Sequence, residues 1–538
     1  MISIPTKQLR KNSVTMKALT ALSALLALTG VEASAQQYLT KAYLPLYRDA
    51  EQIGNLYSQS RNPAGLRFSP VDGVLDFNVG YDLTRGELHD VDESGHINML
   101  NVGLSGQQRF GNIVCQGGIS YDDGKALNRR WNSTSVISAD NPFILGDSIR
   151  SDFNSQYFKL RGRVAYNPTD ALTLGIELGY DATSSANQTD PRPKTDGALF
   201  NIAPGALLRL SDSFTLGLAA RYTLMSEGIT HTIVDTRESY VYFRFNGLGG
   251  YSVMGTGTSS SYPRDYKGHT IEGSAQLQWT ASCGLESLLE PYYRTLSETA
   301  RDGGAVFTFK GGDFSSTQYG LSEKLRLGRS DRRHTLTLSA SAADNSGDWY
   351  DQTSYSDPNK NNQLSFRVER KVNIYSQKRQ SLGADYRFDK MRSAQAPLFT
   401  LGAAARIDHV LTEWTDGDYY HREYTNLTGS LSGAYHLGFG RDNLLSASLT
   451  LKGSAPLSRE QSVAARIQAI YTDPQAEYAT ATTAGGDLAL RYSRLIRGLW
   501  VGAYAEASYT RFLGTGHWTD LLNNSDRRSF AFGLQLYF

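Results

Sequence analysis

Three positive charges lie at alternate positions of one short stretch of this chain, at Lys159, Arg161 and Arg163. Glu177 and Asp181 follow after an Asn-Pro-Thr-Asp sequence that predicts a turn. In β-structure a period of two places such residues on one face. Two kinds of chemistry fit: a polar lining that selects solutes, or a ladder of ion pairs between neighbouring strands. Counting back from the turn predicts that Arg161 lies near Glu177.

The same alternation of charged with apolar residues recurs along the chain. Opposite charges are often neighbours, which favours the ion-pair ladder, and a selectivity lining for a polar or anionic solute is the functional alternative. The residues predicted to share this polar face are Lys159, Arg161, Arg163, Glu177, Asp181, Arg221, Lys324, Arg326, Asp385, Arg387, Arg406, Asp408, Arg491 and Glu506.

Motifs for hydrolytic chemistry are few. Gly146-Asp147-Ser148-Ile149 resembles the nucleophile block of a GDS-type esterase, but no alternation of strands and helices surrounds it. Asp408-His409 resembles the acid–histidine pair of outer-membrane barrel proteases, whose site also needs paired acids elsewhere. The nine histidines are scattered, and no HExxH or paired CxxC motif occurs. The sequence predicts no metal, no cofactor and no enzyme activity.

A long connection at residues 226–268 is rich in aromatic residues and arginine. Such mixtures are common on surfaces that recognise carbohydrates or proteins, and a rigid two-stranded hairpin fits the same residues equally well. The candidate recognition residues in this connection are Tyr240, Tyr242, Phe243, Arg244, Tyr251 and Tyr262.

The element that must position these residues is the amphipathic β-strand. In the first clear example Leu75, Phe77 and Val79 alternate with polar or small residues. About eighteen such stretches follow one another with no helical domain between them. In a soluble sandwich their apolar faces would meet a second sheet. In a membrane barrel these faces meet lipid, and the polar faces line the lumen.

The connections between the stretches alternate in length. Tight turns are predicted near residues 111, 168, 212, 282, 329, 392, 440 and 496, and long connections at residues 86–97, 122–156, 183–198, 226–268, 299–316, 343–374, 411–424, 453–482 and 512–527. Short periplasmic turns and long extracellular loops are typical of an outer-membrane barrel. The predicted fold is therefore all-β, a transmembrane antiparallel up-and-down β-barrel of about 18 strands.

The chain ends on an apolar strand. Phe530, Phe532, Leu534, Leu536 and Phe538 alternate with smaller or more polar residues up to the carboxyl terminus. This pattern resembles the C-terminal signal that bacterial outer-membrane barrels present to their assembly machinery. The resemblance implies that the barrel assembly machinery recognises the strand ending at Phe538.

The first 35 residues have the features of a secretory signal peptide. Basic residues precede an apolar run at residues 18–28, and Ala33-Ser34-Ala35 supplies a cleavage site. No stretch after residue 35 reaches the ~18 apolar residues of a spanning helix. We expect cleavage near Ala35, export to the outer membrane and a barrel at residues 73–538. The net charge of +1 gives no reason to expect nucleic-acid binding.

Residues 36–72 precede the first strand. Leu46, Ala50, Ile53 and Tyr57 have helical spacing, which predicts a short amphipathic helix that straps the periplasmic rim or plugs the lumen. Asn62-Pro63-Ala64-Gly65-Leu66 resembles a motif found before the first strand in long-chain fatty-acid transporter barrels. Nothing else in the chain matches that family, and a charged lumen suits a lipid path poorly. A Pro-Gly turn is the simpler interpretation.

In general style, the chain after residue 35 resembles the uncharacterised outer-membrane barrel proteins of Bacteroidota. The predicted function is a channel or substrate-binding transport component for a polar solute. One alternative is a non-enzymatic surface or accessory partner of an outer-membrane uptake or secretion complex, which would bind an outer-membrane protein or lipoprotein. The other is an outer-membrane hydrolase.

Overall fold

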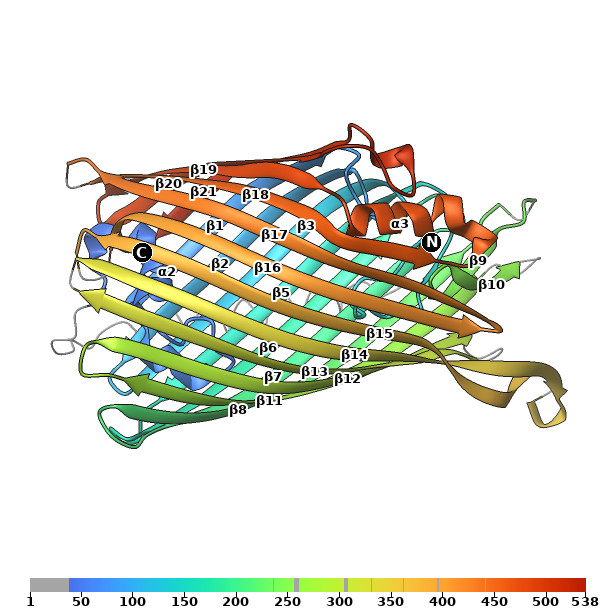
Figure 1. Ribbon diagram of the computed structural model, residues 1–538, viewed down its shortest axis with the longest axis horizontal. Helices are drawn as coiled ribbons and strands as arrows, with labels where there is room; N and C mark the ends of the chain where they lie inside the picture. The colour runs from blue at the N-terminus through green and yellow to red at the C-terminus, as the bar shows by residue number, and fades with distance from the viewer. Residues whose placement is uncertain are drawn as a thin grey trace, which may run out of the picture. The chain divides into compact units, whose positions relative to one another are not determined.

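The computed structural model describes residues 38–235, 237–255, 261–303, 308–329, 331–360, 362–393, 396–440 and 442–538. Eighteen strands form one antiparallel sheet. The first strand, β1 (Gly73–Arg85), pairs with both β2 (His96–Phe110) and the last strand, β21 (Asp526–Tyr537). The sheet therefore closes into a barrel (Figure 1), and the predicted fold class and strand count are confirmed.

The other wall strands follow in chain order around the barrel. They are β3 (Ile113–Arg129), β5 (Ser151–Tyr166), β6 (Leu172–Ala186), β7 (Pro193–Arg209), β8 (Phe214–Thr232), β11 (Ser261–Thr280), β12 (Leu285–Gly303), β13 (Thr308–Arg329), β14 (Arg332–Asp357), β15 (Gln363–Met391), β16 (Pro397–Asp416), β17 (Asp418–Gly438), β18 (Asn443–Ser462), β19 (Thr483–Ile496) and β20 (Leu499–Phe512). A small second sheet joins β4 (Leu145–Gly146), β9 (Val241–Gly247) and β10 (Gly250–Gly255).

The helices are short and lie in the connections and before β1. They are η1 (Lys41–Leu46), α2 (Tyr47–Gly54), η2 (Pro63–Phe68), η3 (Pro358–Lys360), η4 (Ala465–Ile470), α3 (Thr472–Ala479) and η5 (Asp520–Leu522). The predicted amphipathic helix is present as α2, with Ala50 and Ile53 buried. Among the described residues no helix has the length and apolar character needed to cross a bilayer. The predicted signal peptide lies outside the described residues.

The wall has an apolar outer face. Leu218, Leu382 and Leu431 are 70%, 62% and 63% exposed, although leucine is ordinarily buried. Each alternates along its strand with residues that face the lumen, because successive side chains of a strand point to opposite sides. Closure also leaves no free wall edge, which an open sheet would expose to pairing with other chains.

All eight predicted tight turns separate paired strands. Five of the nine predicted long connections are shorter than predicted, because residues 183–198, 226–268, 299–316, 343–374 and 411–424 are mostly strand. Outside the apolar band both faces of a strand contact water, so apolar alternation disappears while the backbone ladder continues. Gly417 alone separates β16 from β17, with a φ of +86° that favours glycine.

The longest of these extensions belongs to β14 and β15. The β13–β14 ladder ends at Asp348, and the β15–β16 ladder ends at Tyr375. Residues 349–372 therefore pair only with each other and form a ribbon that projects beyond the neighbouring strands (Figure 1).

Candidate functional site

The charged residues predicted to share a polar face all lie on wall strands, on the side away from the exposed leucines and tyrosines. Alternation therefore turns their side chains into the lumen. Seven ion pairs join most of them: Arg161–Asp181, Arg163–Glu177, Arg221–Glu177, Arg326–Glu286, Arg387–Asp389, Arg406–Asp408 and Arg491–Glu506. Within the described residues Lys159, Lys324 and Asp385 form no salt bridge. Selection of a solute by this set stays a prediction.

Arg161 lies near enough to Glu177 to interact with it electrostatically, as predicted, but it is not the residue directly opposite. Arg163 lies opposite Glu177, and Arg161 instead binds Asp181 at 2.6 Å. The β5–β6 ladder ends at Tyr166 opposite Leu174, so the connection is longer than the four-residue turn that the counting assumed. A longer connection changes the register of the pairing while keeping the same residues on the inner face.

Residues 38–72, the N-terminal segment, lie inside the end of the barrel that carries the short turns (Figure 1). Side-chain hydrogen bonds or ion pairs join this segment to wall strands on all sides of the lumen. These strands are β1, β2, β7, β8, β11, β12, β13, β14, β15 and β20. Contacts around so much of the circumference mean that the segment obstructs this end of the lumen.

Positive side chains of the wall bind the carboxyl end of helix α2. Arg326 Nη1 donates to the Ile53 carbonyl at 2.9 Å, and Arg333 Nη1 donates to the same oxygen at 3.1 Å. Lys324 Nζ donates to Ser58 Oγ at 3.2 Å. The last carbonyls of a helix lack intrahelical partners and carry partial negative charge. Lys324 and Arg326, predicted as lumen lining, therefore anchor the N-terminal segment.

Apolar packing completes this obstruction. Leu44, Leu46 and Ala50 are buried in one cluster with Trp500 and Tyr537 of the wall. Trp500 Nε1 also donates to the Lys41 carbonyl at 2.7 Å. The Trp500 indole N–H and the Lys41 carbonyl bond to each other, so neither polar group is left unsatisfied where the cluster excludes water.

The sequence Asn62-Pro63-Ala64 of the N-terminal segment contacts the barrel wall where the hydrogen-bond ladders of two strand pairs are interrupted. The β7–β8 pairing skips Ala203 and Pro204, and the β11–β12 pairing skips Pro291. Proline has no N–H to donate to a ladder. Asn62 Nδ2 instead donates to the carbonyls of Ala206 at 3.0 Å and Leu218 at 3.2 Å. A hollow of about 880 Å³ lies on the outer face over the same strands.

Three segments fold together at the opposite end: residues 130–150, 241–255 and 463–482, here called the loop cap. Wall carboxylates hold the first of them from inside the barrel. The backbone N–H of Val136 donates to Glu227 at 2.5 Å, and that of Ser138 donates to Glu298 at 2.8 Å. Phe143 is fully buried against Tyr375 and Trp414, which face inward from β15 and β16. The loop cap therefore obstructs the lumen at the long-loop end.

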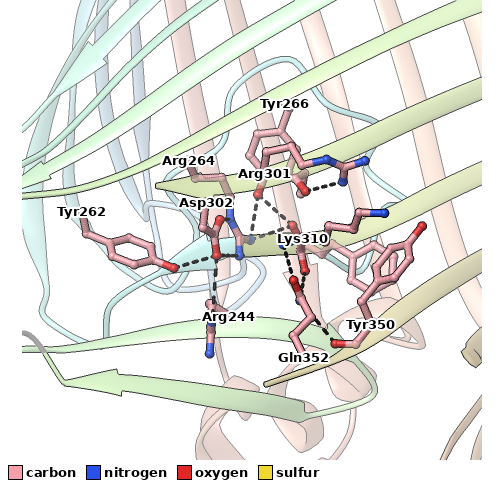
Figure 2. A network of polar contacts seen from close by, with 11 residues as sticks. Arg244, Tyr262, Arg264, Tyr266, Arg301, Asp302, Lys310, Tyr350 and Gln352 are labelled. Carbon is pink, nitrogen blue, oxygen red and sulfur yellow. Dashed lines mark hydrogen bonds and ion pairs between the residues drawn. The ribbon is translucent and has the colours of Figure 1, made fainter. Parts of the chain in front are cut away.

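A buried ion pair fastens the loop cap to β11 and β12 (Figure 2). The side chains of Arg264 and Asp302 are both 0% exposed and bind each other through two hydrogen bonds. Tyr262 donates to Asp302 at 2.6 Å. Arg264 at 3.2 Å and Tyr266 at 2.7 Å both donate to the carbonyl of Phe143. Buried charges persist only when they are paired and hydrogen-bonded in this way.

Five of the six predicted recognition residues belong to the interior of the loop cap or its contact with the wall. Tyr242 is 1% exposed and stacks on Tyr262, with ring centroids 5.3 Å apart. Arg244 lies over the Phe309 ring at 4.2 Å, and Phe243 packs against Tyr251. Tyr240 lies in the connection before β9. Recognition of a ligand by these residues stays a prediction, and packing accounts for the aromatic content of the connection.

The loop at residues 86–95 contains an acidic group expected to make the loop end sensitive to pH. Burial raises the pKa of Asp90 to about 8, and repulsion from Asp92 adds to the effect. A folded-state pKa above the unfolded value means that stability is complete at low pH and is lost as pH rises through about 8. We expect amide protection factors in this loop to fall as the pH rises from about 4 to about 8, and to stay level above that. In the Asp90→Asn variant the protection factors should stay constant over this pH range. An equal fall in the variant and the unmodified chain would show that Asp90 does not cause the pH dependence.

Between the two obstructions a hollow of about 450 Å³ lies against the inner face of β14 to β20. On β15, Arg387 binds Gln52 of the N-terminal segment and Arg379 binds Asp140 of the loop cap. Gly383 and Asp385 of the hollow lie between these contacts in the sequence. Its hydroxyl-bearing residues are Thr337, Ser339, Thr428, Ser430, Ser454, Thr483 and Thr510.

The residues that resemble catalytic motifs are not arranged for hydrolysis. Asp408 faces the lumen and binds Arg406 at 2.9 Å, whereas the next residue, His409, points to the other side of β16 and lies 3.1 Å from Thr425. Asp147 accepts a hydrogen bond from the backbone of Ile149. No cluster of three or more His, Cys, Asp or Glu side chains within the described ranges could hold a metal ion.

The sequence analysis missed the residues that hold the loop cap. Glu227, Glu298 and Asp302 were not singled out, and Arg264 was not assigned to the inner face. The sequence did contain a signal for Glu227. Like Arg221, Glu227 has an odd number on β8, and the odd-numbered side chains of this strand face the lumen. Glu227 and Arg264 lie in the predicted long connection at residues 226–268, where the alternation was not followed.

Solved structures similar to this chain include transporters and receptors. The copper transporter OprC aligns at 9% identity and a TM-score of 0.41, over 87% of this chain and 80% of OprC. The RagAB peptide importer aligns at 7% identity and a TM-score of 0.41, over 87% and 86%. A Pseudomonas aeruginosa FadL homologue aligns at 11% identity and a TM-score of 0.33, over 91% and 95%. Similarity this low gives no information about the solute.

No curated protein matches the chain in sequence. A family model described as a family of unknown function, DUF6850, matches residues 63–538. This range includes η2 and every strand of the barrel. The chain belongs to the DUF6850 family.

Proposed function

We propose that this protein is an outer-membrane barrel that binds and transports a polar solute, and that the structure is its closed state. The observation that carries the proposal is the polar hollow in the lumen between two separately anchored obstructions. A barrel of eighteen strands has room for an aqueous channel unless it is plugged. Here the N-terminal segment plugs one end and the loop cap obstructs the other.

The outer face supports a membrane location. Large apolar side chains on successive strands are exposed, among them Leu178, Leu218 and Leu534. Soluble proteins rarely expose contiguous apolar surface on this scale, whereas lipid would cover it. Both termini of the barrel and all eight tight turns lie at one end, which we assign to the periplasm because short turns lie there in outer-membrane barrels. The loop cap is then extracellular.

Single-channel recording in planar bilayers tests the proposal. The chain after residue 35 should give no current steps while both obstructions are in place. Removal of residues 38–60, together with replacement of residues 132–146 by a short Gly-Ser linker, should give stable current steps because both ends are then open. Each single deletion should give fewer or smaller steps than the double deletion.

Folding must be verified for each variant, since many contacts are removed. A heat-modifiable band in SDS gels reports a folded barrel. A variant that changes fewer residues is Arg326→Ala with Arg333→Ala, which removes the two hydrogen bonds to the Ile53 carbonyl. It should produce intermittent current, because the N-terminal segment is then held less firmly. A folded double deletion without current would overturn the proposed transport function.

Other parts of the proposal rest on the sequence. Export with cleavage near Ala35, recognition of the strand ending at Phe538 by the assembly machinery, and the resemblance to barrels of Bacteroidota all agree with an outer-membrane protein. No motif or site geometry supports an enzyme, so we propose a non-enzymatic function.

A further inference from the structure

The hollow in the lumen has a lining that indicates what it binds. Most of its side chains are small, and Gly383 and Ala404 leave room at its centre. Ser430 and Thr428 project beside them from β17. None of the lining residues is aromatic. A ligand here would therefore be held by hydrogen bonds to hydroxyl groups, which can both donate and accept.

The charges of the hollow are nearly balanced. Arg406 binds Asp408 at 2.9 Å, and Lys452 binds Asp487 at 2.7 Å. Asp385 forms no salt bridge within the described part of the chain. Lys324 of β13 lies close enough to Asp385 to interact with it electrostatically, so the hollow and its surroundings carry no excess charge, which disfavours a charged solute. Neither cation is unpaired, so a peptide carboxylate would have to displace an existing partner.

We propose that this hollow binds a neutral, polyhydroxylated solute of the short-oligosaccharide class. The proposal rests on the proposed transport function and names its substrate class. A carboxylate such as Asp385 can accept from two neighbouring hydroxyl groups at once, and charge-assisted bonds of this kind are the stronger ones. Serine and threonine hydroxyls would pair with the remaining sugar hydroxyls. The volume of about 450 Å³ lies within the usual range of small-molecule sites.

Saturation-transfer NMR on the full chain in detergent tests this inference. The protein is refolded from urea in the presence of the probes, so that entry does not depend on the two obstructions. The probes are maltotriose, cellotriose, laminaritriose and mannotriose as neutral sugars, with trigalacturonate and triglycine as charged comparators. We expect saturable signals from at least one neutral sugar and none from the comparators.

Variants locate the binding. Ser430→Leu fills the hollow and should abolish the sugar signal, and Asp385→Asn should weaken the affinity about tenfold. Ser120→Leu makes the same change as Ser430→Leu on the inner face of β3, outside the hollow, and should leave binding unchanged.

Three results would overturn the inference: no signal from any neutral sugar, equal sugar signals from Ser430→Leu and the unmodified chain, or saturable binding of trigalacturonate. These results are distinct from failure of the proposed function, which is the absence of current in a folded double deletion. Current without sugar binding would refute the substrate class and leave transport standing.

Discussion

Replacing Arg264 with alanine is expected to weaken the loop cap by about 3–5 kcal/mol, because Asp302 is then a buried carboxylate whose remaining charged neighbour, Arg244, lies 3.9 Å away. Both side chains are fully buried, and Arg264 also donates to the Phe143 carbonyl. Hydrogen exchange at residues 131–147 measures the effect. Amides in this stretch should lose protection, while those of the wall strands keep theirs.

Two further variants separate the ion pair from general damage. Arg264→Met with Asp302→Leu removes the two fully buried charges, and should recover part of the lost protection because only Arg244, whose side chain is 10% exposed, then loses a charged neighbour. Arg367→Ala breaks the exposed pair with Glu369, whose side chains are 73% and 43% exposed, and should change little. Unchanged protection of residues 131–147 in Arg264→Ala would show that other contacts hold the cap.

Asn62→Ala is expected to destabilise the barrel by about 2–4 kcal/mol, since each buried polar group left unsatisfied costs about 1–3 kcal/mol. The Asn62 amide supplies hydrogen bonds to the carbonyls of Ala206 and Leu218, and to Gln276 at 2.8 Å. Urea unfolding in detergent, followed by tryptophan fluorescence, measures the change. The loss should include the wall itself, because these carbonyls belong to interrupted ladders.

The nature of the substitution tests the reason for this effect. Asn62→Asp keeps the acceptor for the Ala64 N–H but removes the donors, so it should be about as destabilising as alanine. Asn359→Ala, in the exposed turn η3, is the matched control and should leave the midpoint unchanged. If Asn62→Asp unfolded at the same urea concentration as the unmodified chain, the donors would not stabilise the wall.

The two obstructions differ in a way that bears on opening. Cations and apolar residues of many wall strands hold the N-terminal segment. The loop cap consists of loop segments, and buried side chains of several wall strands hold it, among them Glu227, Glu298 and Arg264. Because loops of low local stability are the usual moving parts of proteins, the loop cap is the end that we expect to open first when a solute binds.

Individual elements show which features of the fold could be predicted from the sequence. The strand from Leu75 to Leu83 was identified by its alternation alone, since a period of two is a local property of neighbouring residues. The tight turn at Gly111 follows equally from local backbone preference, with a φ of +57°. The ribbon at residues 349–372 was missed, because strands with both faces in water carry no apolar alternation.

The sequence by itself determined the barrel, its approximate strand number and many of the charges that face inward, because each follows from alternation and turns within a few tens of residues. Only the tertiary structure decided that the lumen is obstructed. Asn62 meets Gln276 across 214 positions, and Arg61 meets Glu290 across 229. Such contacts depend on which residues the closed barrel brings together, and no periodicity in the chain records them.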